Sequence, residues 1–247
     1  MAAKPGVSPD TVARIWRVRR LHPHRATHHK LSTDRHFAEK LREVVALYLR
    51  PPEHALVLRV DERTQIPALD RTQSILPLRP GVPERQTHDY RRNGTTDLCA
   101  ALEAVEGRII GECHKQHPAV EFLAFPRTLD RSTPPELHLH LVLDNLSTHT
   151  TPEVKRWVLR HPRFHVHFVP TSSSWLNQVE RWFNDLTQKR IRRGTFRSEH
   201  ELIEALKQYV ATHDEDPRPF RWRATADQIL AKVTWNRLNA NQAGAPH

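Results

Sequence analysis

Two apolar runs of the chain each end in an aspartate, and they constrain the fold more than any other feature. Residues 54–62 read HALVLRVDE and residues 136–145 read ELHLHLVLDN, so Asp61 and Asp144 close the two runs. The second run carries a leucine at every other position, which is the period of a β-strand. Nearly apolar strands are typical of central strands with both faces covered. We therefore predict an α/β protein with polar groups at its strand ends.

Helical periodicity separates these strands. Apolar residues recur there at spacings of three and four, and several segments open with a capping residue. A hairpin is expected to turn at Glu106 and Gly107, whereas residues 62–94 are basic and rich in turn-forming residues. This order of elements predicts a mixed sheet flanked by helices. The segments with helical spacing are residues 34–50, 119–129, 151–161, 175–191 and 200–214.

The charge balance of the chain indicates a polyanionic partner. Of its 247 residues, 38 are Lys or Arg and 28 are Asp or Glu, giving a formal net charge of +10. Clustered basic residues point to DNA or RNA. The two cysteines form no C-x-x-C pair and the 18 histidines lack zinc-site spacing, so no zinc site is expected, and the absence of a disulfide framework fits a cytoplasmic location. Neither a membrane-spanning run nor a secretion signal is present in the sequence.

The first 33 residues are expected to form a separate DNA-binding segment and linker. Ser8, Pro9 and Asp10 give a helix start, and the basic helix that follows resembles the second helix of a helix-turn-helix unit. An ordinary solvated basic helix is the alternative. The residues expected to contact DNA are Arg14, Arg17, Arg19, Arg20, Arg25 and Lys30.

Three acidic residues are the candidates for chemistry. Asp61 and Asp144 lie at strand ends, although an aspartate there can also act as a cap, and Glu62 competes with Asp61. Glu180 lies beside the apolar arc of its helix, whereas Asp185 lies on the opposite side. A partly buried acid needs an arginine or a cation as its partner. The apolar arc consists of Leu176, Val179, Phe183 and Leu186.

Three carboxylates on separate elements suit Mg²⁺ or Mn²⁺, which prefer oxygen ligands. Two such ions about 4 Å apart can activate a nucleophile and stabilise the leaving oxygen in phosphodiester displacement. Because the chain is also basic, these acids indicate a nuclease or a strand transferase.

Four segments resemble the insertion sequence 630 family of bacterial transposases, which are relatives of the eukaryotic mariner group. The resemblance runs over about residues 8 to 233, and it implies a ribonuclease H-like fold with a DDE triad. In that family pattern the first acid is Asp61 rather than Glu62, the second is Asp144 and the third is Glu180, with 35 residues between the last two. The segments that carry the resemblance are VDERTQIPALDRTQ, THDYRRNGTTDLCAAL, HLVLDNLSTH and PTSSSWLNQVERWF.

Polar and aromatic neighbours of the acids are candidates for catalytic support. They could contact DNA or orient the reacting groups, or they could serve only in packing and capping. These residues are Asn145, Ser147, His149, Trp175 and Asn177.

The resemblance implies a transposase that uses two Mg²⁺ or Mn²⁺ ions. Water would cleave double-stranded DNA at the element ends, and the freed 3′-hydroxyl would then attack target DNA at a TA dinucleotide. Two copies would pair the two ends. The catalytic domain is expected over residues 34–233, with a disordered tail over residues 234–247. The N-terminal region is expected to be a truncated helix-turn-helix remnant. The alternatives are a related nuclease without strand transfer and an inactive DNA-binding remnant.

Overall fold

The computed structural model describes residues 8–18, 32–71, 81, 89–115, 123–145 and 147–243. The chain divides into two compact units, Met1–Leu31 and Ser32–His247. In the first unit the described part is helix α1 (Pro9–Val18), whose start is capped by the Ser8 hydroxyl accepting from the Thr11 backbone amide. The second unit contains the sheet and all the remaining elements described below.

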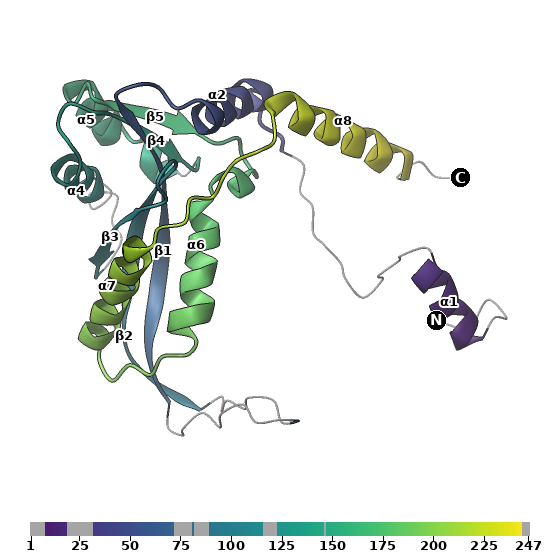
Figure 1. Ribbon diagram of the computed structural model, residues 1–247, viewed down its shortest axis with the longest axis horizontal. Coiled ribbons are helices and arrows are strands. Elements are labelled where there is room, and N and C mark those ends of the chain that lie inside the picture. The colour runs from purple at the N-terminus through teal and green to yellow at the C-terminus, as the bar shows by residue number, and fades with distance from the viewer. Residues whose placement is uncertain are drawn as a thin grey trace. The chain divides into compact units, whose positions relative to one another are not determined.

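A five-stranded mixed sheet forms the centre of the second unit, with the order β3-β2-β1-β4-β5 (Figure 1). β1 pairs antiparallel with β2 and parallel with β4, while β5 continues the parallel side. The predicted mixed sheet is therefore confirmed. The two apolar runs that close with Asp61 and Asp144 lie in neighbouring strands, but Asp61 lies within β1 and not at its end as expected, because β1 continues in its pairing with β2. The strands are β1 (Ala55–Arg71), β2 (Tyr90–Glu103), β3 (Ile109–His114), β4 (His138–Leu143) and β5 (Phe164–Phe168).

β1 is longer than the apolar run that predicted it. It continues beyond Glu62 to Arg71 and pairs with β2 along its whole length, so the expectation of turn-rich structure directly after Glu62 is wrong. The β1–β2 pairing shifts in register between Arg63 and Ile66 and again between Pro67 and Leu69. These shifts let the pair of strands accommodate Pro67. A bulge tolerates a residue that donates no backbone hydrogen bond, and sequence periodicity does not reveal it.

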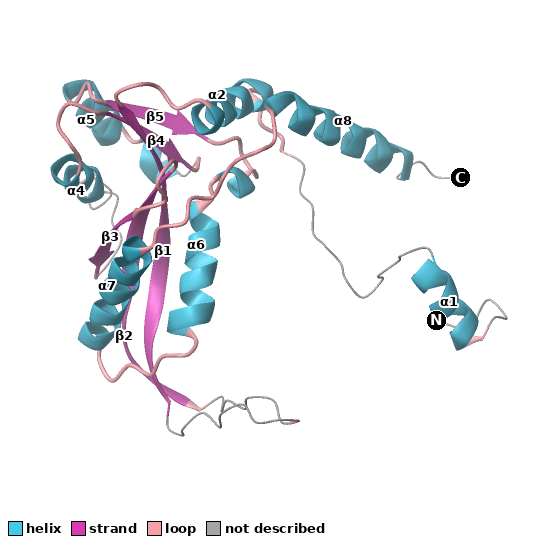
Figure 2. Ribbon diagram, viewed as in Figure 1, coloured by secondary structure: helices cyan, strands magenta, loops and turns pink. Residues whose placement is uncertain are grey.

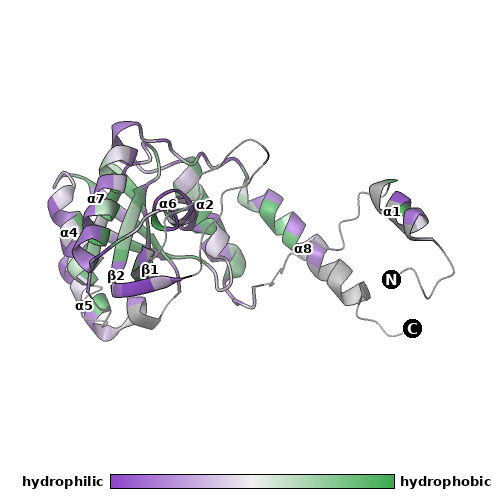
Figure 3. Cartoon of the chain, turned by 90° about the horizontal axis from the view of Figure 1, so that it is seen from below, coloured by the Kyte–Doolittle hydropathy of each residue, from purple (hydrophilic) through white to green (hydrophobic). Residues whose placement is uncertain are grey.

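Helices cover both faces of this sheet (Figure 2). On one face, α6 and α7 pack against β1 and β2 through a cluster that includes Ala100, Trp182 and Leu202. On the other face, α4 and α5 pack through Phe125 and Trp157. Figure 3 shows the apolar residues gathered on the strands and on the helix sides turned toward them, as burial of an apolar stripe requires. The helices are α2 (Phe37–Leu49), α4 (Ala124–Ser132), α5 (Pro152–Arg160), α6 (Val179–Leu186), α7 (Glu199–Glu215) and α8 (Ala226–Ala243).

Three helix boundaries differ from the sequence-based expectation. α4 begins at Ala124, so Pro126 lies in its first turn, where a missing N–H is harmless, rather than near its end. The 175–191 segment is divided into a short 3₁₀ turn, α6 and a π-helical turn. α8 continues to Ala243, well into the tail expected to be disordered, because no glycine or proline interrupts it. Among the described residues, no helix has the length and apolar content needed to cross a lipid bilayer.

Candidate active site

The parallel register places Asp61 and Asp144 side by side. Ala55 pairs with His138 and Arg59 with Val142, a constant offset of 83 positions. The same offset, continued two residues past the last pair, puts Asp144 opposite Asp61. Laterally paired residues share a face of a sheet, because side chains alternate along each strand. Asp61 also pairs with Ala100, which lies in the cluster under α6 and α7, so the two aspartates point toward the α6 face.

Glu180 reaches the same place from the first turn of α6. Asn177, two residues before that helix, is 2 % exposed and donates its side-chain amide to the Val60 carbonyl at 2.9 Å. Val60 is the residue before Asp61, so this hydrogen bond ties the segment ahead of α6 to the part of β1 that carries Asp61. The Glu180 backbone amide in turn donates to the Asn177 carbonyl at 3.2 Å. Two hydrogen bonds in series, both through Asn177, therefore connect the Glu180 backbone to the peptide group between Val60 and Asp61.

The pKa of Asp61 reflects the nearness of the other acids. Burial first, and then the negative charges of Asp144, Glu180 and Glu62, together raise the pKa of Asp61 to about 7, although a hydrogen bond from the Glu62 amide lowers it. A carboxyl group that titrates near neutrality in a cluster of acids indicates a site built for a cation. Three carboxylate donors fit Mg²⁺ or Mn²⁺.

The acids are near one another without being closed around a single point. Among the described residues, no group of three or more His, Cys, Asp or Glu side chains is arranged to hold a metal ion.

His149 bridges Asp144 and Glu62. It lies in the 3₁₀ turn Ser147–Thr150 after β4, and its side chain is 2 % exposed. Its Nδ1 lies 3.0 Å from Asp144 Oδ1, and its Nε2 lies 3.7 Å from Glu62 Oε1, an ion-pair distance rather than a hydrogen bond. Burial disfavours the charged ring, but the contacts with Asp144 and Glu62 outweigh it and raise the pKa of His149 to about 9.

A buried arginine that the sequence reasoning did not select lies on the same face as Asp61. Arg59 is 1 % exposed, and its guanidinium carbon lies 4.3 Å from the centre of the Tyr48 ring. The Tyr48 hydroxyl donates to the Leu176 carbonyl at 3.0 Å, next to the Asn177 tether. Burial lowers the pKa of Arg59, and Tyr48 and Glu103 partly offset this effect. A charge inside an apolar strand was the signal that could have identified Arg59.

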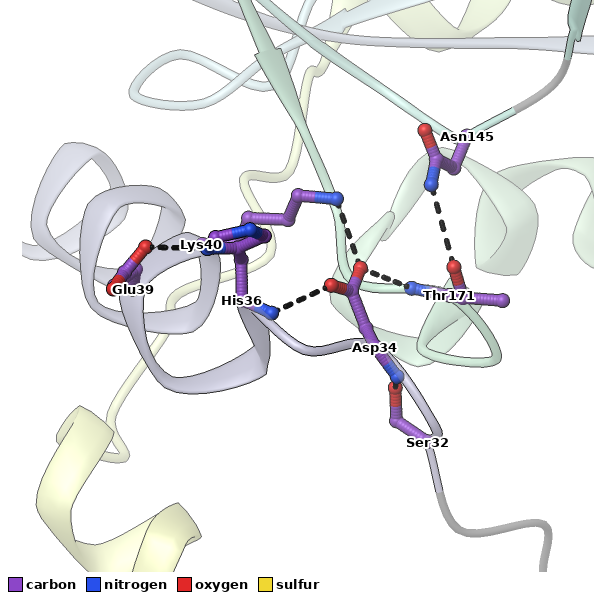
Figure 4. A network of polar contacts seen from close by, with 7 residues as sticks. All are labelled: Ser32, Asp34, His36, Glu39, Lys40, Asn145 and Thr171. Atoms are coloured by element: carbon purple, nitrogen blue, oxygen red, sulfur yellow. Dashed lines mark hydrogen bonds and ion pairs between the residues drawn. The ribbon is translucent and has the colours of Figure 1, made fainter.

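The other expected supporting residues make different contacts. Asn145 donates to the Thr171 hydroxyl at 3.3 Å, and the Thr171 amide donates to Asp34 at 3.2 Å, ahead of α2 (Figure 4). Asn145 therefore braces the loop that leads toward α6. Trp175 is 47 % exposed and stacks on Trp222 with ring centres 6.3 Å apart. The side chain of Ser147 lies outside the described residues.

The basic residues expected to contact DNA are mostly beyond what the structure describes. Arg14 is exposed on α1. The side chain of Arg17 is not described, and Arg19, Arg20, Arg25 and Lys30 lie outside the described residues. Their contact with DNA stays a prediction.

Comparison with solved structures defines the class of this fold as ribonuclease H-like. A Mos1 transposase paired-end complex with the left transposon end aligns with a TM-score of 0.57 at 18 % identity, over 87 % of this chain and 66 % of the other. A Mos1 mariner paired-end complex with Mg aligns with the same TM-score at 18 % identity, over 100 % of this chain and 74 % of the other. At this identity the likeness concerns the fold.

The chain belongs to the DDE superfamily endonucleases, since the model of that family matches residues 56–203, more than half of the sequence. A weaker relative is the insertion element IS630 uncharacterized 39 kDa protein of Shigella sonnei, which is 24 % identical over 115 residues. That match spans 47 % of this chain and 34 % of the relative, so the chain matches about a third of the curated relative's length. Asp61, Asp144 and Glu180 all lie within the range matched by the family model.

Proposed function

We propose that this protein is a DNA transposase that cleaves double-stranded DNA at the ends of an insertion element and joins the freed ends to target DNA. Asp61, Asp144 and Glu180 are its catalytic acids. The observation that supports the proposal is the β1–β4 register, which sets Asp61 opposite Asp144, while Asn177 ties the segment that leads to Glu180 to the Val60 carbonyl. Similar folds occur in transposase complexes with DNA and with Mg.

The three acids would hold Mg²⁺ or Mn²⁺, two ions as in other phosphodiester-cleaving sites. When bound, these ions supply charge neutralisation at the phosphodiester and activation of the attacking oxygen. The chain's own part is to fix the carboxylates on rigid elements. Asn177 and Asn145 fix the approach of α6, and His149 orients Asp144. Exposed arginines and lysines bind the DNA backbone, which the net charge of +10 favours.

The partners follow from this activity. The substrate is DNA, first the element ends and then a target with a TA dinucleotide. Two copies of the chain pair the two ends, and the reaction takes place in the cytoplasm on nucleoid DNA. Ends joined to a second duplex distinguish a transposase from a nuclease that only cleaves.

Asp144→Asn tests the proposal, because it keeps the shape of the side chain and removes the charge. We expect loss of Mg²⁺-dependent cleavage of a duplex that carries the element end, by a factor of at least about 1,000. Cleavage is measured on a gel with end-labelled DNA. Asp185→Asn, on the exposed side of α6, is the control and should cleave normally. Full cleavage by Asp144→Asn would refute the assignment.

A further inference from the structure

Glu62 follows the first catalytic aspartate directly but faces the other side of the sheet. It pairs with Cys99, which lies in the cluster beneath α4 and α5, whereas Asp61 pairs with Ala100 beneath α6. The Glu62 side chain is nevertheless only 7 % exposed. A carboxylate is costly to bury without a partner, so its retention at this position needs a reason.

The contacts of His149 supply that reason. Both ring nitrogens face a carboxylate: Nδ1 lies 3.0 Å from Asp144 Oδ1, and Nε2 lies within ion-pair distance of Glu62 Oε1. Nδ1 also lies 3.2 Å from the Asp144 backbone carbonyl. The ring is almost fully buried, so it has little freedom to turn away. It connects Glu62, within β1, with Asp144, directly after β4, at the level of the proposed catalytic acids.

We propose that Glu62 and His149 are positioning residues, with Glu62 fixing the His149 ring and His149 fixing the orientation of the Asp144 carboxylate toward a divalent cation. This inference rests on the proposed metal-dependent function. It assigns Glu62 a role at a distance from the cation rather than as a fourth ligand. Partners that orient a ligand from behind typically change metal affinity by about 10- to 100-fold when they are removed.

Mn²⁺ binding to the full chain tests this role without measuring turnover. Free Mn²⁺ is followed by electron paramagnetic resonance for the wild type, Glu62→Gln, His149→Gln and the double variant. We expect each single variant to bind Mn²⁺ about 10- to 100-fold more weakly. Because Glu62 acts through His149, the double variant should bind no more weakly than His149→Gln alone. Asp185→Asn is the matched control and should bind like the wild type.

The double variant also distinguishes a positioning role of Glu62 from a role as a metal ligand. If Glu62 were itself a ligand, its replacement would weaken binding further in the His149→Gln background, and effects that multiply would overturn the proposal. Wild-type Mn²⁺ affinity in Glu62→Gln would overturn it as well. If His149→Gln does not fold, judged by far-UV circular dichroism, His149→Asn replaces it as the background, and the effect of Glu62→Gln should vanish there.

The same experiment tests the proposed function separately. If Asp144→Asn binds Mn²⁺ as tightly as the wild type, the metal site itself is wrong, and the positioning role falls with it. If Asp144→Asn loses binding while Glu62→Gln retains it, the metal site stands and only the positioning role is rejected.

Discussion

The carboxyl group of Asp61 makes the stability of the folded protein depend on pH. Burial raises its pKa to about 7, well above the value of about 3.8 that an unfolded chain would give it. Between these two values the folded protein holds a proton that the unfolded protein has lost. The free energy of unfolding of the metal-free protein therefore falls as pH rises through this window, and it stays low above pH 7.

Asp61→Asn removes this penalty and gives a prediction. Without metal at about pH 8, we expect the variant to be more stable than the wild type by on the order of 1–4 kcal/mol, since one pKa unit corresponds to about 1.4 kcal/mol. The difference should shrink as pH falls toward about 4. Urea unfolding in the presence of a chelator measures it. Added Mg²⁺ should stabilise the wild type and not the variant. A stability difference between the two proteins that is the same at about pH 8 and about pH 4 would contradict the argument.

At the scale of elements, the entry into α6 depends on a few hydrogen bonds. This helix runs only from Val179 to Leu186, so its own propensity contributes little to its stability. Asn177 ties it to β1, and Tyr48 ties the preceding turn to α2.

Removing the Asn177 tether should therefore affect both stability and chemistry. Asn177→Ala leaves the Val60 carbonyl without its side-chain donor, which should lower the free energy of unfolding by about 1–3 kcal/mol. We also expect slower DNA cleavage, because Glu180 loses its fixed distance from Asp61. Asn184→Ala, at an exposed position on the same helix, is the control. Denaturant midpoints and cleavage rates unchanged from wild type would show that the tether is dispensable.

The β2–β3 turn requires glycine at one position. Gly107 has a φ of +81°, and a Cβ there would lie 2.7 Å from the Pro219 backbone nitrogen. Gly107→Ala should cost at least about 1–2 kcal/mol, through the left-handed conformation alone. Gly111, on β3, meets only ordinary contacts of 3.4 Å or more, so Gly111→Ala should be milder. Melting temperatures of the two variants test this difference. Equal losses of stability in Gly107→Ala and Gly111→Ala would contradict the role assigned to the close approach of Pro219 to Gly107.

At the scale of the whole molecule, the net charge gives a test of the proposed DNA partner. A formal charge of +10 predicts binding to duplex DNA that weakens as salt rises, because each neutralised phosphate releases a counterion. Fluorescence anisotropy with a labelled duplex, in a chelator so that cleavage does not occur, should give a negative slope of log affinity against log salt. A slope near zero would remove the electrostatic argument for a DNA partner.

Much of the fold was predictable because local patterns specify it. The leucines at 139, 141 and 143 lie in one cluster, as their spacing predicted. Thr151 caps α5 by accepting from the Val154 amide, as expected of threonine before proline. The extension of β1 was not predictable, because a bulged hairpin depends on pairing with β2 rather than on its own period.

The sequence was sufficient to indicate which residues could form strands and helices and which acids close the apolar runs, since side-chain periodicity, capping residues and apolar runs act over a few positions. That β1 continues past Asp61, and that Asp61 and Asp144 meet, depends on long-range pairing. Asp61 faces Asp144 because two strands far apart in sequence pair in parallel at one register, and a shift of one residue would turn one carboxylate to the opposite face. The same long-range packing brings His149 between Asp144 and Glu62, a pairing that no local pattern encodes.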